Sequence, residues 1–325
     1  MVSLFERILE AHEGIRPDVP VSTLERSTLL SRELESDVWL KAEHLMPTGS
    51  FKVRGSANKI RTLGTAAKRT GVITASTGNH GQGVARAGGL AGVGVTVYVS
   101  RTTTKSKMAA IEALGAELVV VQGSALDAEK EARHQSELTG KPYVAPYNDL
   151  DTVAGQGTLG VELFEQASDL DAVFVCVGGG GLIGGVGTAL KMLNPRTRVV
   201  GVWPKASTCM LDSLNAGHIV ETPEYETLSD GSTGAVEPGS VTFPICQEVI
   251  DETLTVSEDE IAHAMRLVAE GERWMIEGAA GVAVAGLIQT AARYRGKKVA
   301  VVLCGRNIAV ETFLDAMKRG ESEHS

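Results

Sequence analysis

Short apolar runs alternate with amphipathic stretches along most of this 325-residue chain. The apolar runs predict strands at residues 38–41, 71–75, 94–99, 117–121, 143–145, 172–177, 198–202 and 298–303. Apolar positions at helical spacing predict helices at residues 106–114, 126–138, 182–193, 258–269 and 278–294. Because strands that alternate with helices usually form parallel sheets covered on both faces, the pattern predicts the α/β class.

Two segments lack this alternation. Residues 204–243 are rich in Ser, Thr, Gly and Pro, and we expect irregular structure there that wraps the domain. The last residues, 320–325, are expected to fray. The hydrophobic share of 43% is that of an ordinary globular protein, and the length suits one large domain or two smaller ones.

The charge balance narrows the possible partners. A net charge of −9 with scattered basic residues argues against binding to nucleic acids or anionic membranes. No apolar run approaches the length of a membrane span, and the N-terminus lacks the order of a signal peptide. The four cysteines are widely spaced, which fits a reducing compartment better than disulfides or a zinc site. We expect a cytoplasmic protein.

Lys52 is the first candidate for chemistry. Within residues 47–55 it stands between an apolar run and a helical pattern, flanked by Phe51 and Val53. The positive end of a helix dipole and partial desolvation both disfavour the ammonium form, so Lys52 could serve as a nucleophilic amine. A solvated surface lysine is the alternative for this position taken alone.

A second motif, at residues 75–83, follows a predicted strand and opens a helix. Ser76, Thr77, Asn79 and His80 lie there together with free backbone N–H groups, which suits a carboxylate. A simple helix cap is the alternative.

A third motif consists of Gly178, Gly179, Gly180 and Gly181, between a predicted strand and a helix. Glycines let the backbone approach an anion, and the helix start favours a phosphate. The run continues into a Gly-x-Gly-x-x-Gly match, but no acidic residue ends the next strand, at residues 202–204. The phosphate interpretation therefore survives, whereas a nicotinamide dinucleotide site is disfavoured.

Cys304 ends the last predicted strand, where its thiol could face a ring nitrogen. A buried structural cysteine is the alternative. A lysine for an imine, a glycine cradle for a phosphate and a weak partner for a heterocyclic nitrogen together fit one ligand, pyridoxal phosphate.

With these motifs in this order, the chain resembles the fold-type II pyridoxal-phosphate enzymes, which are tryptophan synthase β-like, in the branch of threonine/serine dehydratases and serine racemases. The matching segments are residues 47–55, 76–82, 155–158, 178–181, 276–281 and 304–307. The resemblance implies a large domain of residues 1–46 and 147–325, a small domain of residues 47–146, and a homodimer. It implies no isoleucine-regulated domain after the catalytic core.

The resemblance also implies residue roles. Lys52 would carry pyridoxal 5′-phosphate and act as general base. The other cofactor contacts would come from Phe51, Asn79, Gly178, Gly179, Gly180, Gly181, Glu277 and Cys304. The substrate carboxylate would be bound by Ser76, Thr77, Asn79 and His80.

The implied reaction is the β-elimination of water from a β-hydroxy amino acid such as L-threonine or L-serine, which yields a 2-oxo acid and ammonia. A neutral partner for the ring nitrogen favours prompt elimination over transamination. The alternatives are a racemase, a dehydratase of a hydroxyectoine-derived amino acid, a non-catalytic phosphate-binding protein and a nicotinamide-dependent oxidoreductase.

Three positions depart from the family pattern, and so does the segment at residues 146–148, near the expected substrate. Thr77 stands where serine racemases place a catalytic serine, so a catalytic role in racemisation is possible but disfavoured. Trp203 replaces a metal-binding Glu, so we expect no metal. Arg306 replaces a small residue and is a candidate for the substrate carboxylate, or else a solvated side chain. Because of these departures, the identity of the substrate is not determined by the resemblance.

Overall fold

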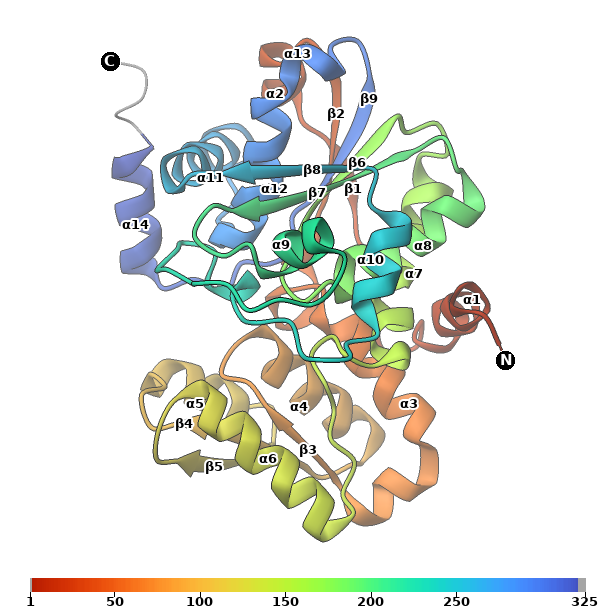
Figure 1. Ribbon diagram of the computed structural model, residues 1–325, viewed down its shortest axis with the longest axis vertical. Coiled ribbons are helices and arrows are strands. Elements are labelled where there is room, and N and C mark those ends of the chain that lie inside the picture. The colour runs from red at the N-terminus through yellow and green to blue at the C-terminus, as the bar shows by residue number, and fades with distance from the viewer. Residues whose placement is uncertain (1, 321–325) are drawn as a thin grey trace.

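The computed structural model describes residues 2–320, so most of the tail predicted to fray lies outside the described residues. Two sheets, each flanked by helices, occupy the upper and lower parts of the molecule in Figure 1. All but one of the strand pairings are parallel. The predicted α/β class with parallel sheets flanked by helices is confirmed.

The larger sheet has six strands, and its only antiparallel pairing within the described residues joins β1 to β2. In spatial order the strands are β1 (Leu24–Arg26), β2 (Asp37–Lys41), β9 (Lys298–Val302), β6 (Ala172–Cys176), β7 (Arg198–Pro204) and β8 (Glu252–Val256). Every residue of β6 is buried, because helices cover both faces of the sheet at its centre.

The smaller sheet has three parallel strands in the order β3 (Val72–Ala75), β4 (Val95–Ser100) and β5 (Glu117–Val121). Its core is a separate cluster that includes Ile60, Val84 and Val97. All three strands fall within residues 47–146. The division of the chain into domains at 46/47 and 146/147 itself stays a prediction.

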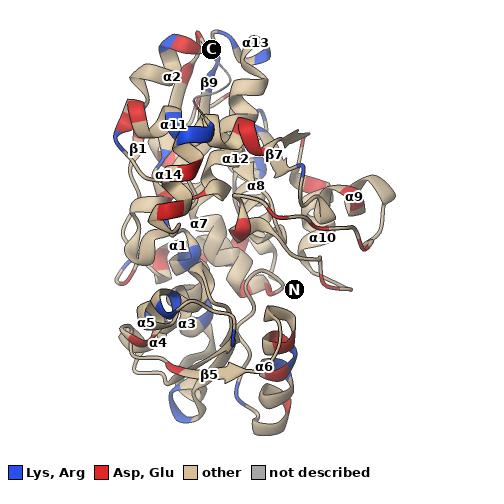
Figure 2. Ribbon diagram, turned by 90° about the vertical axis from the view of Figure 1, so that its left-hand side faces the viewer, with Lys and Arg blue, Asp and Glu red and all other residues tan. Residues whose placement is uncertain are grey.

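Helices connect the strands. They are α1 (Leu4–Gly14), α2 (Thr28–Glu33), α3 (Lys52–Thr70), α4 (Asn79–Ala91), α5 (Lys105–Glu112), α6 (Ala125–Thr139), α7 (Leu150–Gln166), α8 (Gly181–Leu193), α9 (Cys209–Ala216), α10 (Thr242–Val249), α11 (Glu258–Glu272), α12 (Gly278–Gln289), α13 (Ala291–Tyr294), α14 (Val310–Arg319) and the short 3₁₀ turns η1 (Glu43–Leu45), η2 (Pro47–Gly49) and η3 (Asp230–Ser232). Within residues 2–320, no helix is both long and apolar enough to cross a membrane. Figure 2 shows the positions of acidic and basic residues intermixed along the visible helices.

Some sequence predictions were wrong in detail. Residues 143–145 form only an isolated bridge from Tyr143 to Ile73, since Pro142 and Pro146 on either side cannot donate to a ladder. The helix predicted at residues 278–294 is interrupted at Thr290. The edge strands β1 and β8 were missed because their exposed residues break the apolar pattern. The irregular segment at residues 204–243 does contain one helix, α9.

Candidate active site

A cavity of about 2420 Å³ lies where the carboxyl ends of β3, β6 and β9 approach one another. This is the edge at which parallel sheets usually bind ligands. Its lining includes twelve of the thirteen predicted site residues, namely Phe51, Lys52, Ser76, Thr77, Asn79, His80, Gly178, Gly179, Gly180, Gly181, Glu277 and Cys304. The fold thus brings together residues from five separate segments of the chain.

Lys52 is the first residue of α3, and its amine is enclosed where the two sheets meet. The Nζ atom donates to the carbonyl oxygen of Pro146 at 3.1 Å and lies 5.1 Å from the centre of the Phe51 ring. Burial lowers the pKa of Lys52 to about 8, an effect that the neighbouring Cys304 and Glu277 partly offset. A substantial fraction of this side chain is therefore a neutral amine at mildly alkaline pH.

The glycine run forms the start of α8. Gly180, its N-cap residue, has φ +83°, and no side chain caps the first turn of the helix. Thr242 donates to the carbonyl oxygen of Gly179 at 2.6 Å, which holds that oxygen against α10. A Cβ atom at Gly179 would lie 2.5 Å from the ring of Tyr147. An uncapped helix start that only glycine can build is a suitable cradle for a phosphate.

Cys304 and Glu277 lie at the end of the cavity near Lys52. Burial raises the pKa of the Cys304 thiol well above its usual value, so this group stays neutral. Burial also raises the pKa of Glu277 to about 7, against the opposing effect of its hydrogen bond from Asn79. A heterocyclic nitrogen beside Cys304 would therefore meet an uncharged partner.

Glu277 also belongs to a chain of amide contacts. The Asn79 amide donates to the two Glu277 carboxylate oxygens at 2.9 and 3.2 Å. The backbone N–H of Asn307 donates to the same carboxylate at 3.0 Å. The side-chain amide of Asn307 donates to the Asn79 side-chain oxygen at 2.5 Å. These contacts fix the orientation of Asn79 in the cavity. The predicted contact of Asn79 with the cofactor remains a prediction.

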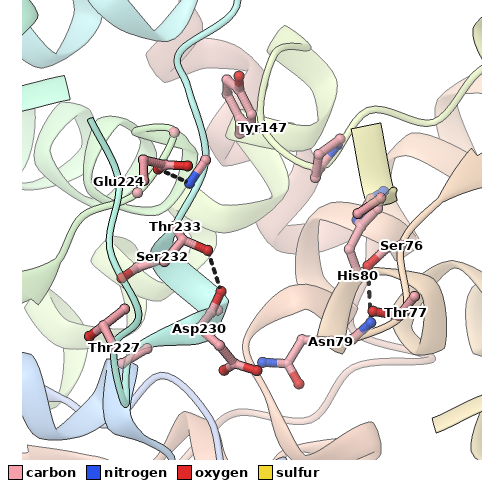
Figure 3. Close-up of a pocket in the computed structure, with 18 of the residues that line it drawn as sticks. Ser76, Thr77, Asn79, His80, Tyr147, Glu224, Thr227, Asp230, Ser232 and Thr233 are labelled. Atoms are coloured by element: carbon pink, nitrogen blue, oxygen red, sulfur yellow. Dashed lines mark hydrogen bonds between the residues drawn. The ribbon is translucent and has the colours of Figure 1, made fainter. Parts of the chain in front are cut away.

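Ser76, Thr77 and Asn79 form one wall of the cavity, on the right in Figure 3. The Ser76 hydroxyl accepts from the backbone N–H of Gly78 at 3.2 Å, and α4 begins at Asn79 without a side-chain cap. A helix start of this kind, lined with hydroxyls, is suited to a carboxylate.

The His80 ring is already hydrogen-bonded to the backbone, which limits the role predicted for it. Its Nε2 atom lies 2.9 Å from the carbonyl oxygen of Val144, so that nitrogen carries the proton. Burial lowers its pKa to about 3, so the ring is neutral and Nδ1 is a bare acceptor. The ring therefore offers no proton to a carboxylate, and its contribution there is limited to its backbone N–H.

Arg306 is the predicted site residue that does not line the cavity. Its side chain is exposed, and its backbone N–H donates to the carbonyl oxygen of Gly49 at 3.0 Å. The pKa of His44 is lowered, mainly by burial and also by the positive charge of Arg306. The guanidinium does not line the cavity in this structure, and the predicted contact of Arg306 with substrate stays a prediction.

Trp203, the other departure from the family pattern, is 1% exposed and packs in the hydrophobic core around the larger sheet. Among residues 2–320, no three His, Cys, Asp or Glu side chains gather in a way that could hold a metal ion.

Several lining residues escaped the sequence analysis. Figure 3 shows Asp230, Thr233 and Thr227 on the wall opposite Asn79. Asp230 contributes to the raised pKa of Glu277, which places its charge within electrostatic range. These residues come from the irregular segment at 204–243, whose sequence carries turn signals but no periodicity that would reveal where it folds.

The chemistry of the cavity fits pyridoxal phosphate. Lys52 would hold its aldehyde carbon covalently, the uncapped start of α8 would hold its phosphate, and Cys304 would face its ring nitrogen.

Comparisons with known proteins agree with this fit. A family model described as pyridoxal-phosphate dependent enzyme matches residues 15–305. The L-threonine ammonia-lyase of Thermotoga maritima is 38% identical over 321 residues, covering 98% of this chain and 79% of that protein. The processed threonine deaminase isoform 2 of Solanum lycopersicum superposes with a TM-score of 0.93 at 34% identity, covering 97% of this chain and 93% of that one. Maize serine racemase superposes with a TM-score of 0.89 at 29% identity, covering 97% of each chain. The chain therefore belongs to the family of pyridoxal-phosphate dependent enzymes.

Proposed function

We propose that this enzyme eliminates water from a β-hydroxy amino acid such as L-threonine or L-serine and yields a 2-oxo acid and ammonia. The observation that carries the proposal is the pairing, in one cavity, of a lysine amine of lowered pKa with a neutral thiol at the ring-nitrogen position. The similarity to L-threonine ammonia-lyase and threonine deaminase supports it.

Each wall of the cavity has a part in this reaction. When bound, pyridoxal phosphate supplies a ring that accepts electrons from the substrate α-carbon. The helix start at Ser76, Thr77 and Asn79 binds and orients the substrate carboxylate. The Nζ atom of Lys52, once neutral, takes the α-proton as general base.

The neutral Cys304 decides between competing outcomes. A carboxylate in its place would hold the ring nitrogen protonated and prolong the life of a carbanion. Because the thiol cannot do this, loss of the β-hydroxyl follows promptly and transamination is disfavoured.

The test is 2-oxo acid release from cofactor-loaded protein. The panel contains L- and D-serine, L-threonine, both 3-hydroxyaspartates, phenylserine and a hydroxyectoine-derived amino acid. We expect turnover of threonine or serine, and its loss by at least about 10³-fold in Lys52→Ala, since the base is removed. Lys68→Ala is the control, because Lys68 lies exposed on the same helix. Turnover of only a bulkier or acidic substrate would contradict the assignment to threonine and serine.

Racemisation is measured on the same samples. The Thr77 hydroxyl lies in the cavity lining, and maize serine racemase shares this fold. Chiral analysis of residual serine separates the two reactions. Inversion that is lost in Thr77→Ala while elimination persists would establish a second activity.

We propose further that the enzyme is a cytoplasmic homodimer. The acidic, evenly charged chain and its buried cysteines support the location. Light scattering after size-exclusion chromatography tests the assembly, and a mass near 34.2 kDa would contradict a dimer.

A further inference from the structure

Residues 233–241, here called the strap, lead from η3 to α10 without helix or strand structure and contact α6 of the smaller domain. Val236 anchors the strap, since it is 4% exposed and belongs to the core of the larger domain. The next residue, Glu237, faces the other way and lines the cavity.

The Glu237 carboxylate joins two elements that are distant in sequence. One oxygen accepts from the Arg133 guanidinium of α6 at 2.7 Å, and the other accepts from the Asn148 amide at 2.8 Å. Arg133 also stacks over the Tyr143 ring at 4.4 Å, so its position is fixed. The Asn148 side-chain oxygen accepts from the backbone N–H of Val241 at 2.9 Å. These hydrogen bonds hold the strap at Glu237 and at Val241.

The same residue seats an aromatic ring on the glycine run. The Glu237 backbone N–H donates to the Tyr147 hydroxyl at 3.0 Å, and that hydroxyl donates to the carbonyl oxygen of Ala235 at 3.3 Å. The Tyr147 ring then lies against Gly179, where a Cβ atom would come within 2.5 Å of it, and the Tyr147 Cβ lies 3.0 Å from the position of a Cβ atom at Gly181. The strap therefore contacts α6 directly and the start of α8 through Tyr147.

We propose that Glu237 is a positioning residue: through Arg133 it clasps the smaller domain to the strap, and with Asn148 it holds Tyr147 on the glycine run. The clasp sets the spacing between the carboxylate-binding start of α4 and the phosphate-binding start of α8. A second pair, Lys107 with Asp230 at 3.4 Å, also crosses the cavity, but its side chains are more exposed and it is the weaker tie. The inference rests on the proposed function only for the choice of substrate.

Hydrogen exchange of the cofactor-free protein tests the clasp without any reaction. In the wild type, we expect slow exchange of the amides of Glu237 and Val241, both of which are hydrogen-bonded. Glu237→Ala and Arg133→Gln should each speed exchange across residues 233–241 by about threefold to tenfold, the range expected for a partly exposed ion pair. Asp169→Asn, which breaks an exposed ion pair with Lys298 far from the strap, should change nothing there. Unchanged exchange in both strap variants would overturn the proposal.

Kinetics and cofactor binding supply the second readout. With L-threonine, the two variants should raise KM by about threefold to tenfold and leave kcat within about threefold, because the clasp orients binding groups and touches no reacting atom. Their dissociation constants for pyridoxal phosphate should rise by a similar factor. The double variant Arg133→Gln with Glu237→Ala should lose little more than either single variant, as coupled groups do.

The outcomes separate the two proposals. If neither L-threonine nor L-serine is turned over, the function proposed above fails, while exchange and cofactor affinity still decide the clasp. A fall in kcat at constant KM, or losses that add up fully in the double variant, would count against a positioning role for Glu237.

Discussion

Lys52 shows how far neighbouring residues alter a single side chain. Desolvation disfavours its ammonium form, while the Glu277 carboxylate stabilises it. The Cys304 thiol, whose own pKa burial raises well above the usual value, also opposes the loss of the charge on Lys52. The protonation of Lys52 is thus set mainly by burial and is opposed by Cys304 and Glu277.

This balance predicts a pH dependence for cofactor binding. The rate at which pyridoxal phosphate joins the cofactor-free protein should rise with pH and reach half its maximum near pH 8, since the neutral amine is the nucleophile. Glu277→Gln removes the negative neighbour, so the pKa of Lys52 should fall and the midpoint should move to lower pH. Stopped-flow absorbance measures both midpoints. A wild-type midpoint near the ordinary lysine value of 10.5 would refute the argument.

At the scale of elements, the site is built from helix starts. The first residues of α3 and α4, and the glycine run that opens α8, all line the cavity. Helix starts offer unpaired N–H groups and a positive dipole end, which suit the carboxylate of a substrate and the phosphate of the cofactor. In α8 this arrangement requires glycine, because Gly180 has a positive φ and packs against Cys246.

Gly180→Ala tests that requirement. The added Cβ would lie 2.7 Å from the Cys246 sulfur in a backbone conformation that costs a side chain about 1–2 kcal/mol. We expect cofactor affinity to fall by at least about tenfold, since the cradle must shift. Gly140→Ala is the matched control, because Gly140 also has a positive φ (+68°) but has open space around it. Equal losses of cofactor affinity in the two variants, measured by equilibrium titration, would show that strain alone is responsible.

At the scale of the whole molecule, a buried charge network joins the elements that flank the site. Arg54, two residues after Lys52, contacts Glu43 and Glu162 at 2.7 Å each, and Lys41 contacts Glu162 at 2.7 Å. All four side chains are fully buried, and their formal charges cancel. Because these residues come from β2, η1, α3 and α7, the network fixes the start of α3 relative to the larger sheet.

Glu162→Gln should destabilise the protein by about 3–5 kcal/mol, since it leaves two buried cations with one carboxylate. The two cations hold the pKa of Glu162 far below its usual 4.5. Its contribution is therefore present above about pH 4.5 and is lost as the pH falls toward the folded-state pKa. Urea unfolding at several pH values should show a smaller acid-induced loss in the variant. In Asp169→Asn, an exposed-pair control, the change should stay below about 1 kcal/mol.

The sequence by itself determined the α/β class and the central strands, and it predicted twelve of the residues that line the cavity. Apolar runs mark doubly covered strands, and glycines or hydroxyls mark the places where a strand meets a helix, whereas Phe51 and Glu277 were predicted from the family resemblance. Tertiary structure alone decided that Arg306 lies outside the cavity and that the His80 ring donates to Val144. It also decided how the strap ties Glu237 to Arg133. Such contacts join residues that no periodicity relates, because side-chain direction and long-range pairing depend on how the whole chain packs.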